Sequence, residues 1–85
     1  MERGLYRHYK GKYYWVQGIA RDAETLEETV IYQGLYENEF GRNPLWTRRK
    51  TEFENPLEDG SLRYIYIGSY PEATEGIENL ILPEL

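Results

Sequence analysis

Residues 6–36 constrain the fold more than any other part of the sequence, because they contain strand-like segments in direct succession. Residues 13–21 are rich in aromatic and β-branched side chains and contain no proline, which is typical of a β-strand. Similar segments lie at residues 5–9 and 29–36. Gly11, between the first two, can adopt the positive φ angle that a tight turn needs. The sequence therefore predicts a meander of antiparallel strands.

The strand expected at residues 13–21 has two faces of different character. Side chains two residues apart share a face. One face carries Tyr14, Val16, Gly18 and Ala20, and the other carries Tyr13, Trp15, Gln17 and Ile19. We expect the first set to face the core, with Gly18 permitting close backbone approach or a bulge that bends the sheet.

The remaining segments complete a small all-β domain. We expect further strands at residues 45–50 and 62–68, and a short helical turn at residues 51–56. Asp59 and Gly60 between them are a strong turn signal. About five short strands linked by tight turns bury a sheet face only if the sheet curls over on itself. The sequence therefore predicts a small, partly open barrel of the SH3 type.

The chain divides at residue 68. Residues 1–68 form the expected SH3-like domain, and residues 69–85 form an acidic C-terminal extension in which glutamate is the only charged residue type. The spacing of Ile77, Leu80 and Ile81 fits one side of a short helix. We expect the extension to pack on the barrel as a lid, with a free partner-binding arm as the alternative.

Aromatic side chains must provide much of the core. The 85 residues include nine Tyr, two Trp and two Phe but no Cys, so disulfides cannot supplement packing. Each ring buries roughly 150 to 250 Å², and a domain of this size cannot enclose all of them. We therefore expect some rings at the surface, where clustered rings mark contact surfaces.

Charge and hydropathy limit the partners. The net charge of −5 argues against undirected nucleic-acid binding. Most of this charge comes from the extension, since residues 1–68 carry 11 acidic and 10 basic side chains. No apolar run reaches the roughly 20 residues that cross a bilayer, and no signal sequence is evident. We expect a cytoplasmic protein without membrane partners.

The sequence resembles the domain of unknown function 1653 family, a family of small bacterial proteins. The matching positions are Gly4, Tyr6, Arg7, His8, Tyr9, Lys10, Gly11, Tyr14, Val16, Gly18, Ile19, Ala20, Glu24, Thr25, Leu26, Glu27, Val30, Tyr32, Leu35, Tyr36, Leu45, Trp46, Arg48 and Phe53. The resemblance implies an SH3-type barrel, and the family has no established activity to transfer.

The sequence departs from the family pattern at several positions. Asp22 stands where the family has histidine, Ala23 where it has serine, Gln33 where it has arginine, and Arg49 where it has proline. If that histidine serves chemistry in the family, this chain lacks it. Trp15 also replaces a residue that is more often polar, which predicts an outward-facing ring.

The candidate ligand-binding residues are Tyr6, His8, Tyr32, Trp46 and Arg48. His8 is the only histidine, and its free pKa near 6.5 suits anion binding or proton transfer. The alternative is a histidine held within the barrel wall. A ligand site requires that His8, Tyr32 and Trp46 line one open cleft.

No cofactor or metal site is expected. A site built from several imidazoles is excluded by the single histidine. The acidic cluster Asp22, Glu24, Glu27 and Glu28 lacks the EF-hand pattern, so we interpret it as a solvated turn.

The leading hypothesis is a non-catalytic module that binds a protein or peptide through surface rings. Tyr13 and Trp15 provide one candidate surface, for such a partner or for a homodimer. The first alternative is single-stranded nucleic-acid binding through Arg42, Trp46, Arg48 and Arg49, of which Trp46 and Arg48 share a face and Arg49 points away. The second is a small-molecule enzyme in which His8 acts with Tyr6, Tyr32 or Glu24.

Overall fold

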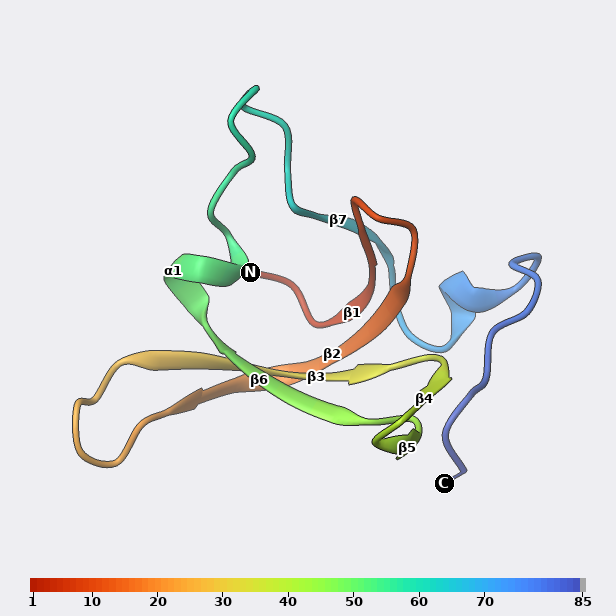
Figure 1. Cartoon of the computed structure of the whole chain (residues 1–85), viewed down its shortest axis with the longest axis horizontal. Helices are drawn as coiled ribbons and strands as arrows, with labels where there is room; N and C mark the ends of the chain where they lie inside the picture. Colours follow the sequence, from red (N-terminus) through yellow and green to blue (C-terminus); the bar gives the residue numbers. More distant parts are fainter. Residues whose placement is uncertain (85) are drawn as a thin grey trace.

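Five strands form the main antiparallel sheet of the computed structural model, which describes residues 1–84 (Figure 1). In sheet order they are β6 (Leu45–Arg49), β3 (Glu28–Gly34), β2 (Tyr13–Arg21), β1 (Gly4–His8) and β7 (Tyr64–Gly68). A separate hairpin consists of β4 (Glu37–Asn38) and β5 (Gly41–Arg42), and the helical segments are α1 (Lys50–Phe53) and the 3₁₀ helix η1 (Glu72–Thr74). The predicted all-β class is confirmed.

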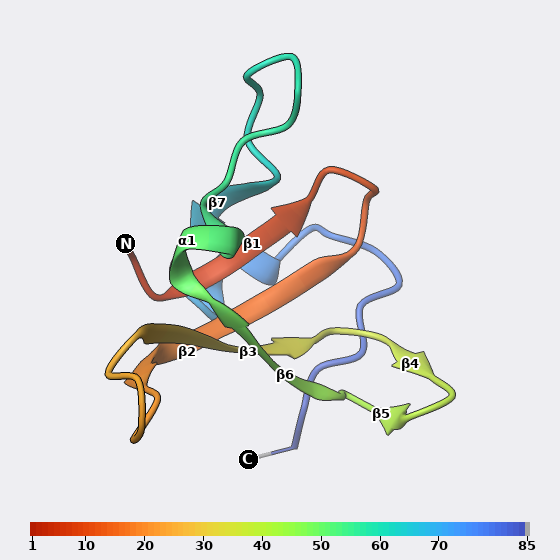
Figure 2. The same ribbon diagram turned by 60° about the vertical axis from the view of Figure 1, so that its left-hand side comes forward.

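The sheet curves strongly but does not close (Figure 2). Strands β6 and β7 are its two edges, and within residues 1–84 they do not pair with each other. Helix α1 follows β6, and the long connection at residues 54–63 projects away from the sheet before it reaches β7. This agrees with the predicted partly open arrangement, whereas the SH3-type assignment stays a prediction.

The turn predicted between the first two strands is present, and a bulge lies next to Gly18 in the pairing of β2 with β3. Gly11 has a φ of +108°, and its N–H donates to the His8 carbonyl at 2.8 Å, which closes the β1–β2 hairpin. The β2–β3 register shifts between Val16 and Gly18, so Gln17 is the extra residue of a bulge. Such a bulge increases the local bend of the sheet.

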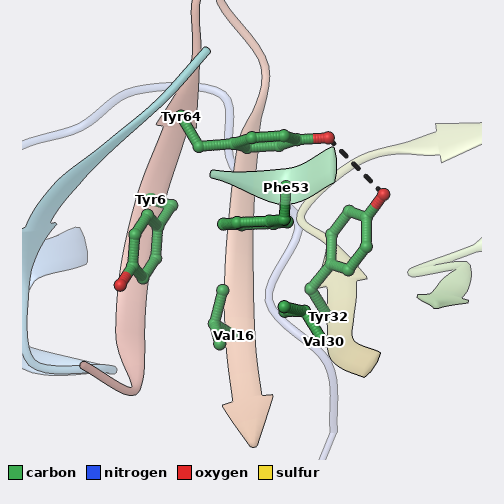
Figure 3. Close-up of a cluster of buried hydrophobic side chains, with 6 residues drawn as sticks. All are labelled: Tyr6, Val16, Val30, Tyr32, Phe53 and Tyr64. Carbon is green, nitrogen blue, oxygen red and sulfur yellow. Dashed lines mark hydrogen bonds between the residues drawn. The ribbon is translucent and has the colours of Figure 1, made fainter. Parts of the chain in front are cut away.

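The core lies on the concave face of the sheet, under α1. Its buried members are Tyr6, Val16, Val30, Tyr32, Phe53 and Tyr64 (Figure 3). Phe53 of α1 stacks on Tyr64 with ring centroids 3.9 Å apart and an interplanar angle of 8°. Tyr6 and Tyr32 meet Phe53 edge to face at 5.6 and 5.3 Å. Phe53 therefore joins β1, β3 and β7 across the open side of the sheet.

The C-terminal segment covers part of the opposite face (Figure 1). The Tyr70 ring stacks on Trp15 at 4.3 Å, and the Ile81 N–H donates to the Leu35 carbonyl at 3.1 Å. Leu5 is a direct cross-strand partner of Trp15 and thus shares its face. Leu5 is 0% exposed and Leu35 is 2% exposed, although neither belongs to the concave core. A second, smaller set of buried apolar side chains thus lies outside the concave core.

The prediction of a short helix around residues 77–81 is wrong. Gly76 and Asn79 have φ angles of +85° and +66°, which a right-handed helix does not allow. Leu35 accepts the Ile81 backbone hydrogen bond that a helix would have made locally. The apolar side chains are spaced as in a helix, but the backbone of this segment bonds to the residue that follows β3. The division of the chain at residue 68 stays a prediction.

In the described chain, residues 1–84, no helix has both the length and the apolar character that would let it cross a bilayer.

Replacing Tyr70 with alanine tests the contribution of the C-terminal segment to stability. The substitution removes the stacked ring from Trp15, which is the cross-strand partner of the buried Leu5. We expect the free energy of unfolding to fall by about 1 to 3 kcal/mol. Urea titration monitored by tryptophan fluorescence measures the free energy of unfolding. The signal of the folded variant should also change, because Trp15 becomes more exposed to water.

Glu72→Ala is the matched control for Tyr70→Ala, because Glu72 is exposed and lies in the same segment. We expect its effect to stay within about 0.5 kcal/mol. Equal stabilities of the two variants would show that the segment does not stabilise the sheet through this stack.

Candidate functional site

All five strands of the sheet contribute to one pocket of about 220 Å³. Its lining residues are His8, Tyr14, Tyr32, Tyr36, Trp46, Arg48 and Tyr64, and we call it the tyrosine pocket. The sheet register explains the gathering, because direct cross-strand partners share a face. His8 lies opposite Tyr64, and Tyr32 lies opposite Trp46. Residues separated by more than 50 positions thereby meet at one end of the concave face.

Tyr36 enters the pocket because Gly34 has no side chain. Gly34 lies opposite Tyr14 in the β2–β3 ladder, so a side chain there would point into the concave face. The Tyr36 ring fills that space instead, and a Cβ atom built on Gly34 would come within 2.6 Å of it. The Tyr36 ring thus lies in the space on the concave face that a side chain of residue 34 would fill.

Two hydrogen-bond networks hold the pocket hydroxyls. In the first, the Trp46 Nε1–H donates to the Tyr36 hydroxyl at 3.0 Å, which lies 3.1 Å from the Tyr14 hydroxyl. In the second, the Arg48 Nε–H donates to the Tyr32 hydroxyl at 3.3 Å, and the Tyr64 hydroxyl lies 3.5 Å away (Figure 3). Tyr36 is therefore the centre of the first network, and Tyr32 is the centre of the second.

Ring packing fixes the walls of the pocket. Tyr14 makes edge-to-face contacts with Tyr32, Tyr36 and Tyr64 at centroid distances of 5.2, 5.5 and 6.0 Å. The His8 ring lies edge to face against Tyr64 at 4.8 Å. Such contacts are favoured by the ring quadrupoles, so the lining side chains support one another.

Burial raises the pKa of two phenols of the pocket, those of Tyr14 and Tyr64. It is the main cause that raises the pKa of Tyr14, and the hydrogen bond with Tyr36 adds to the effect. Burial and the hydrogen bond with Tyr32 likewise raise the pKa of Tyr64. At neutral pH both hydroxyls are protonated and can donate a hydrogen bond.

The His8 ring offers a hydrogen-bond donor at Nε2, because the lone pair of its Nδ1 is already occupied. Its Nδ1 accepts a hydrogen bond from the Lys10 backbone N–H at 3.2 Å, so the neutral ring carries its proton on Nε2. Burial, followed by the nearby charges of Arg63, Lys10 and Arg48, lowers the pKa of His8. The ring is therefore neutral at neutral pH.

The pocket brings together four of the five residues expected to bind a ligand. His8, Tyr32, Trp46 and Arg48 line it, as the expected common cleft requires. Tyr6 lies in a separate hollow with Phe53 and Tyr66, and its hydroxyl donates to the Glu2 carbonyl at 2.6 Å. The ligand-binding role of all five residues stays a prediction.

Sequence reasoning missed three lining residues, namely Tyr14, Tyr36 and Tyr64. Alternation placed Tyr14 on the inner face but gave no reason to assign it to a site. The strand pattern of Tyr64 and Tyr66 around Ile65 gave the same kind of signal. Tyr36 had no local signal, because its position depends on Gly34 and on the register with β2.

The surface expected at Tyr13 and Trp15 is partly covered. Tyr70 stacks on one face of the Trp15 ring, and the Arg7 guanidinium lies 5.9 Å from the centre of the Tyr13 ring. Trp15 does face away from the concave core, but it is half-buried. Its role in a partner surface or a homodimer stays a prediction.

The basic residues of the nucleic-acid alternative do not gather. Arg48 lines the tyrosine pocket with Trp46, whereas Arg49 pairs with Glu27 at 3.3 Å. Arg42 borders a different hollow on the β4–β5 side, with Gln33 and Pro83. The predicted opposition of Arg48 and Arg49 across the strand agrees with these contacts.

The remaining proposed residues lie away from the pocket. Glu24 is in the exposed β2–β3 loop, where its N–H and that of Thr25 donate to Asp22 Oδ1 at 2.9 and 3.0 Å. The acidic cluster is thus a turn. In residues 1–84, no three histidine, aspartate or glutamate side chains converge as metal ligands.

A larger hollow is not the better candidate site. Its volume is about 420 Å³, and exposed charged side chains such as Arg21, Glu27 and Arg49 line it. Several of these already bond to one another or to the backbone. The tyrosine pocket is smaller, but it combines ring surfaces with converging polar groups, which is the usual composition of ligand sites.

Comparisons with known proteins give a family and a similar fold. Residues 4–64 match the family model described as Protein of unknown function (DUF1653), a range that includes every tyrosine-pocket residue. The crystal structure of a DUF1653 protein from Bordetella bronchiseptica is 35% identical, with a TM-score of 0.72, over 81% of this chain and 90% of that chain. Curated proteins gave no match.

Replacing Gly34 with alanine should displace Tyr36. The added methyl group collides with the Tyr36 ring, which must move away from Tyr14 and Trp46. We expect a loss of about 1 to 3 kcal/mol in the free energy of unfolding. We also expect a clear shift of the Trp46 indole N–H resonance in NMR spectra, since that group loses its acceptor.

Gly18→Ala provides the control for Gly34→Ala, because no atom lies within 4 Å of the added methyl group. It should leave the Trp46 indole resonance in place. An unchanged resonance in Gly34→Ala would contradict the role of Gly34 in placing Tyr36.

The buried phenols predict a stability that falls in alkali. Burial raises the pKa of Tyr6 from the ordinary value of 10.0 to about 12, and it also raises the pKa of Tyr14 and Tyr64. Between these values the folded state binds protons that the unfolded chain has lost. The stabilising contribution is therefore complete below about pH 10 and is lost as the pH rises towards 12 and beyond.

Urea titrations at a series of pH values measure this loss. Tyr14→Phe removes one of the raised groups and should reduce the slope of stability against pH above pH 10. A free energy of unfolding that stays constant up to pH 12 would contradict the expectation.

Proposed function

We propose that this chain, which belongs to the DUF1653 family of proteins of unknown function, is a non-catalytic module that holds one group of a protein or peptide partner in the tyrosine pocket. The observation that carries the proposal is the convergence of ring surfaces, two hydroxyl networks and the Arg48 guanidinium around one opening. Rigid tyrosine and tryptophan rings give large contact areas for little loss of conformational entropy.

The size of the pocket favours part of an extended ligand. A volume of about 220 Å³ lies below the roughly 300 to 1,000 Å³ of pockets that enclose a drug-sized molecule. Around the opening, Phe40 is 69% exposed and meets Trp46 edge to face at 5.7 Å. The Lys12 ammonium lies 4.7 Å from the centre of the Tyr36 ring. These side chains give the rest of a peptide further contacts.

The chemistry of the lining favours binding over catalysis. The described lining residues include no carboxylate, serine, threonine or cysteine. The phenols of Tyr14 and Tyr64 are held protonated, and His8 Nδ1 already accepts a hydrogen bond. A paired nucleophile and base is therefore missing from the pocket.

Peptides selected from a random display library on the immobilised protein test the proposal. We expect Trp46→Ala to weaken the selected peptides at least tenfold, which is the size of effect expected when a central aromatic anchor is truncated. Isothermal calorimetry measures the affinity, and circular dichroism verifies that each variant is folded.

Leu45→Ala is the matched control, because Leu45 is the neighbouring residue, is 59% exposed and does not line the pocket. Its affinity should equal that of the wild type. Trp46→Phe, which keeps a ring packed against the core, is the second variant if Trp46→Ala does not fold. Selected peptides that bind the folded Trp46 variants as tightly as the wild type would refute the proposal.

A further inference from the structure

The charged side chain that lines the tyrosine pocket is cationic, although the whole chain is acidic. This side chain is Arg48, whereas Lys12, which lies against the Tyr36 ring, borders a separate hollow that Glu78 also lines. The charges that act on His8 are those of Arg63, Lys10 and Arg48. An opening of this kind has a positive local potential and attracts a negative group.

Arg48 differs from the two basic residues that follow it. Arg49 pairs with Glu27 and Glu52 at 3.3 and 3.7 Å, and Lys50 pairs with Glu54 at 2.8 Å. Within residues 1–84, Arg48 has no carboxylate at ion-pair distance, and Glu52 acts on it only at longer range. The basic side chain that faces the pocket is thus the one in this run that no acid neutralises.

Tyr32 orients the Arg48 guanidinium. Its hydroxyl accepts the Arg48 Nε–H at 3.3 Å. A guanidinium carries five N–H donors in one plane, so four remain for another acceptor. Two of them can meet a carboxylate or phosphate side by side, an arrangement that lysine cannot reproduce.

The tyrosine hydroxyls also present donors. Tyr36 and Tyr32 each accept a hydrogen bond, from Trp46 Nε1–H and Arg48 Nε–H respectively. Each therefore keeps its own proton to donate, either to a neighbouring phenol oxygen or to a ligand. A ligand rich in acceptor atoms fits this set.

We infer that the group held by the tyrosine pocket is an oxyanion, a carboxylate or phosphate carried on a flat or apolar body. This inference rests on the proposed function, because it names the chemistry of the same site. The rings contact the body of the group, and Arg48 with the pocket hydroxyls binds its oxygens. An ammonium ion suits aromatic cages, but here the unneutralised Arg48 would repel it.

Four small probes of one shape test the inference. Benzoate and phenyl phosphate carry an oxyanion, benzamide is a neutral counterpart, and phenyltrimethylammonium is a cation. Each is titrated into the whole chain, and the indole resonances of Trp46 and Trp15 are followed by NMR. We expect both anions to shift the Trp46 signal and to bind at least tenfold more tightly than benzamide, as charge-assisted hydrogen bonds do.

Variants of neighbouring residues identify the group responsible. Arg48→Gln should remove the tenfold preference for the anions, and Arg48→Lys should restore only part of it. Arg49→Gln should retain the preference, because Arg49 bonds to Glu27 away from the pocket. The ratio of benzoate to phenyl phosphate affinity then distinguishes a carboxylate ligand from a phosphate ligand.

Several results would overturn the inference that the bound group is an oxyanion. Benzamide or phenyltrimethylammonium binding as tightly as benzoate would do so and would leave the pocket as a binding site of other chemistry. Anion binding that Arg48→Gln does not weaken would do the same. If none of the probes shifts the Trp46 signal, the oxyanion inference fails, and the selected peptides decide separately whether the module binds there.

Discussion

The fold depends on the stack of Phe53 on Tyr64. It fastens α1 against β7 over the open side of the sheet, and Tyr6 and Tyr32 pack on its edges. A domain of this size without cysteine has few other means of stabilising its two sheet edges. Because most of these rings are tyrosines, the core must also accommodate hydroxyl groups, and a buried hydroxyl requires a hydrogen-bond partner.

The tyrosine pocket follows from that requirement. Tyr32 and Tyr64 belong both to the core and to the pocket lining, with their rings packed inside and their hydroxyls at its polar end. Trp46 and Arg48 supply N–H donors to these networks from the edge strand β6. Core and pocket are thus one structure, so the packing that stabilises the fold also pre-organises the site. Pre-organisation of this kind lowers the entropy lost on binding.

Local patterns predicted the parts of this arrangement that depend on one strand. Alternation places Trp46 and Arg48 on one face and Arg49 on the other, and it assigns Val16 to the core. It cannot place Tyr36, which follows β3 and reaches the pocket only because Gly34 lies opposite Tyr14. The C-terminal segment has the same difficulty. The spacing of its apolar residues fits a helix, but the Ile81 N–H donates instead to the carbonyl of Leu35, which lies 46 residues earlier in the sequence.

Net charge is a poor guide to what the pocket binds. Arg49 and Lys50 are paired with glutamates, and Glu78 shares a separate hollow with Lys12 and Tyr36, so several of the charges lie outside the tyrosine pocket. At physiological salt the screening length is about 8 Å, so only charges close to the opening act strongly on a bound group. Among the charged side chains, the structure places Arg48 in the lining of the pocket itself. The preference of the site is therefore decided by the charges nearest to it and can be opposite in sign to the charge of the whole chain.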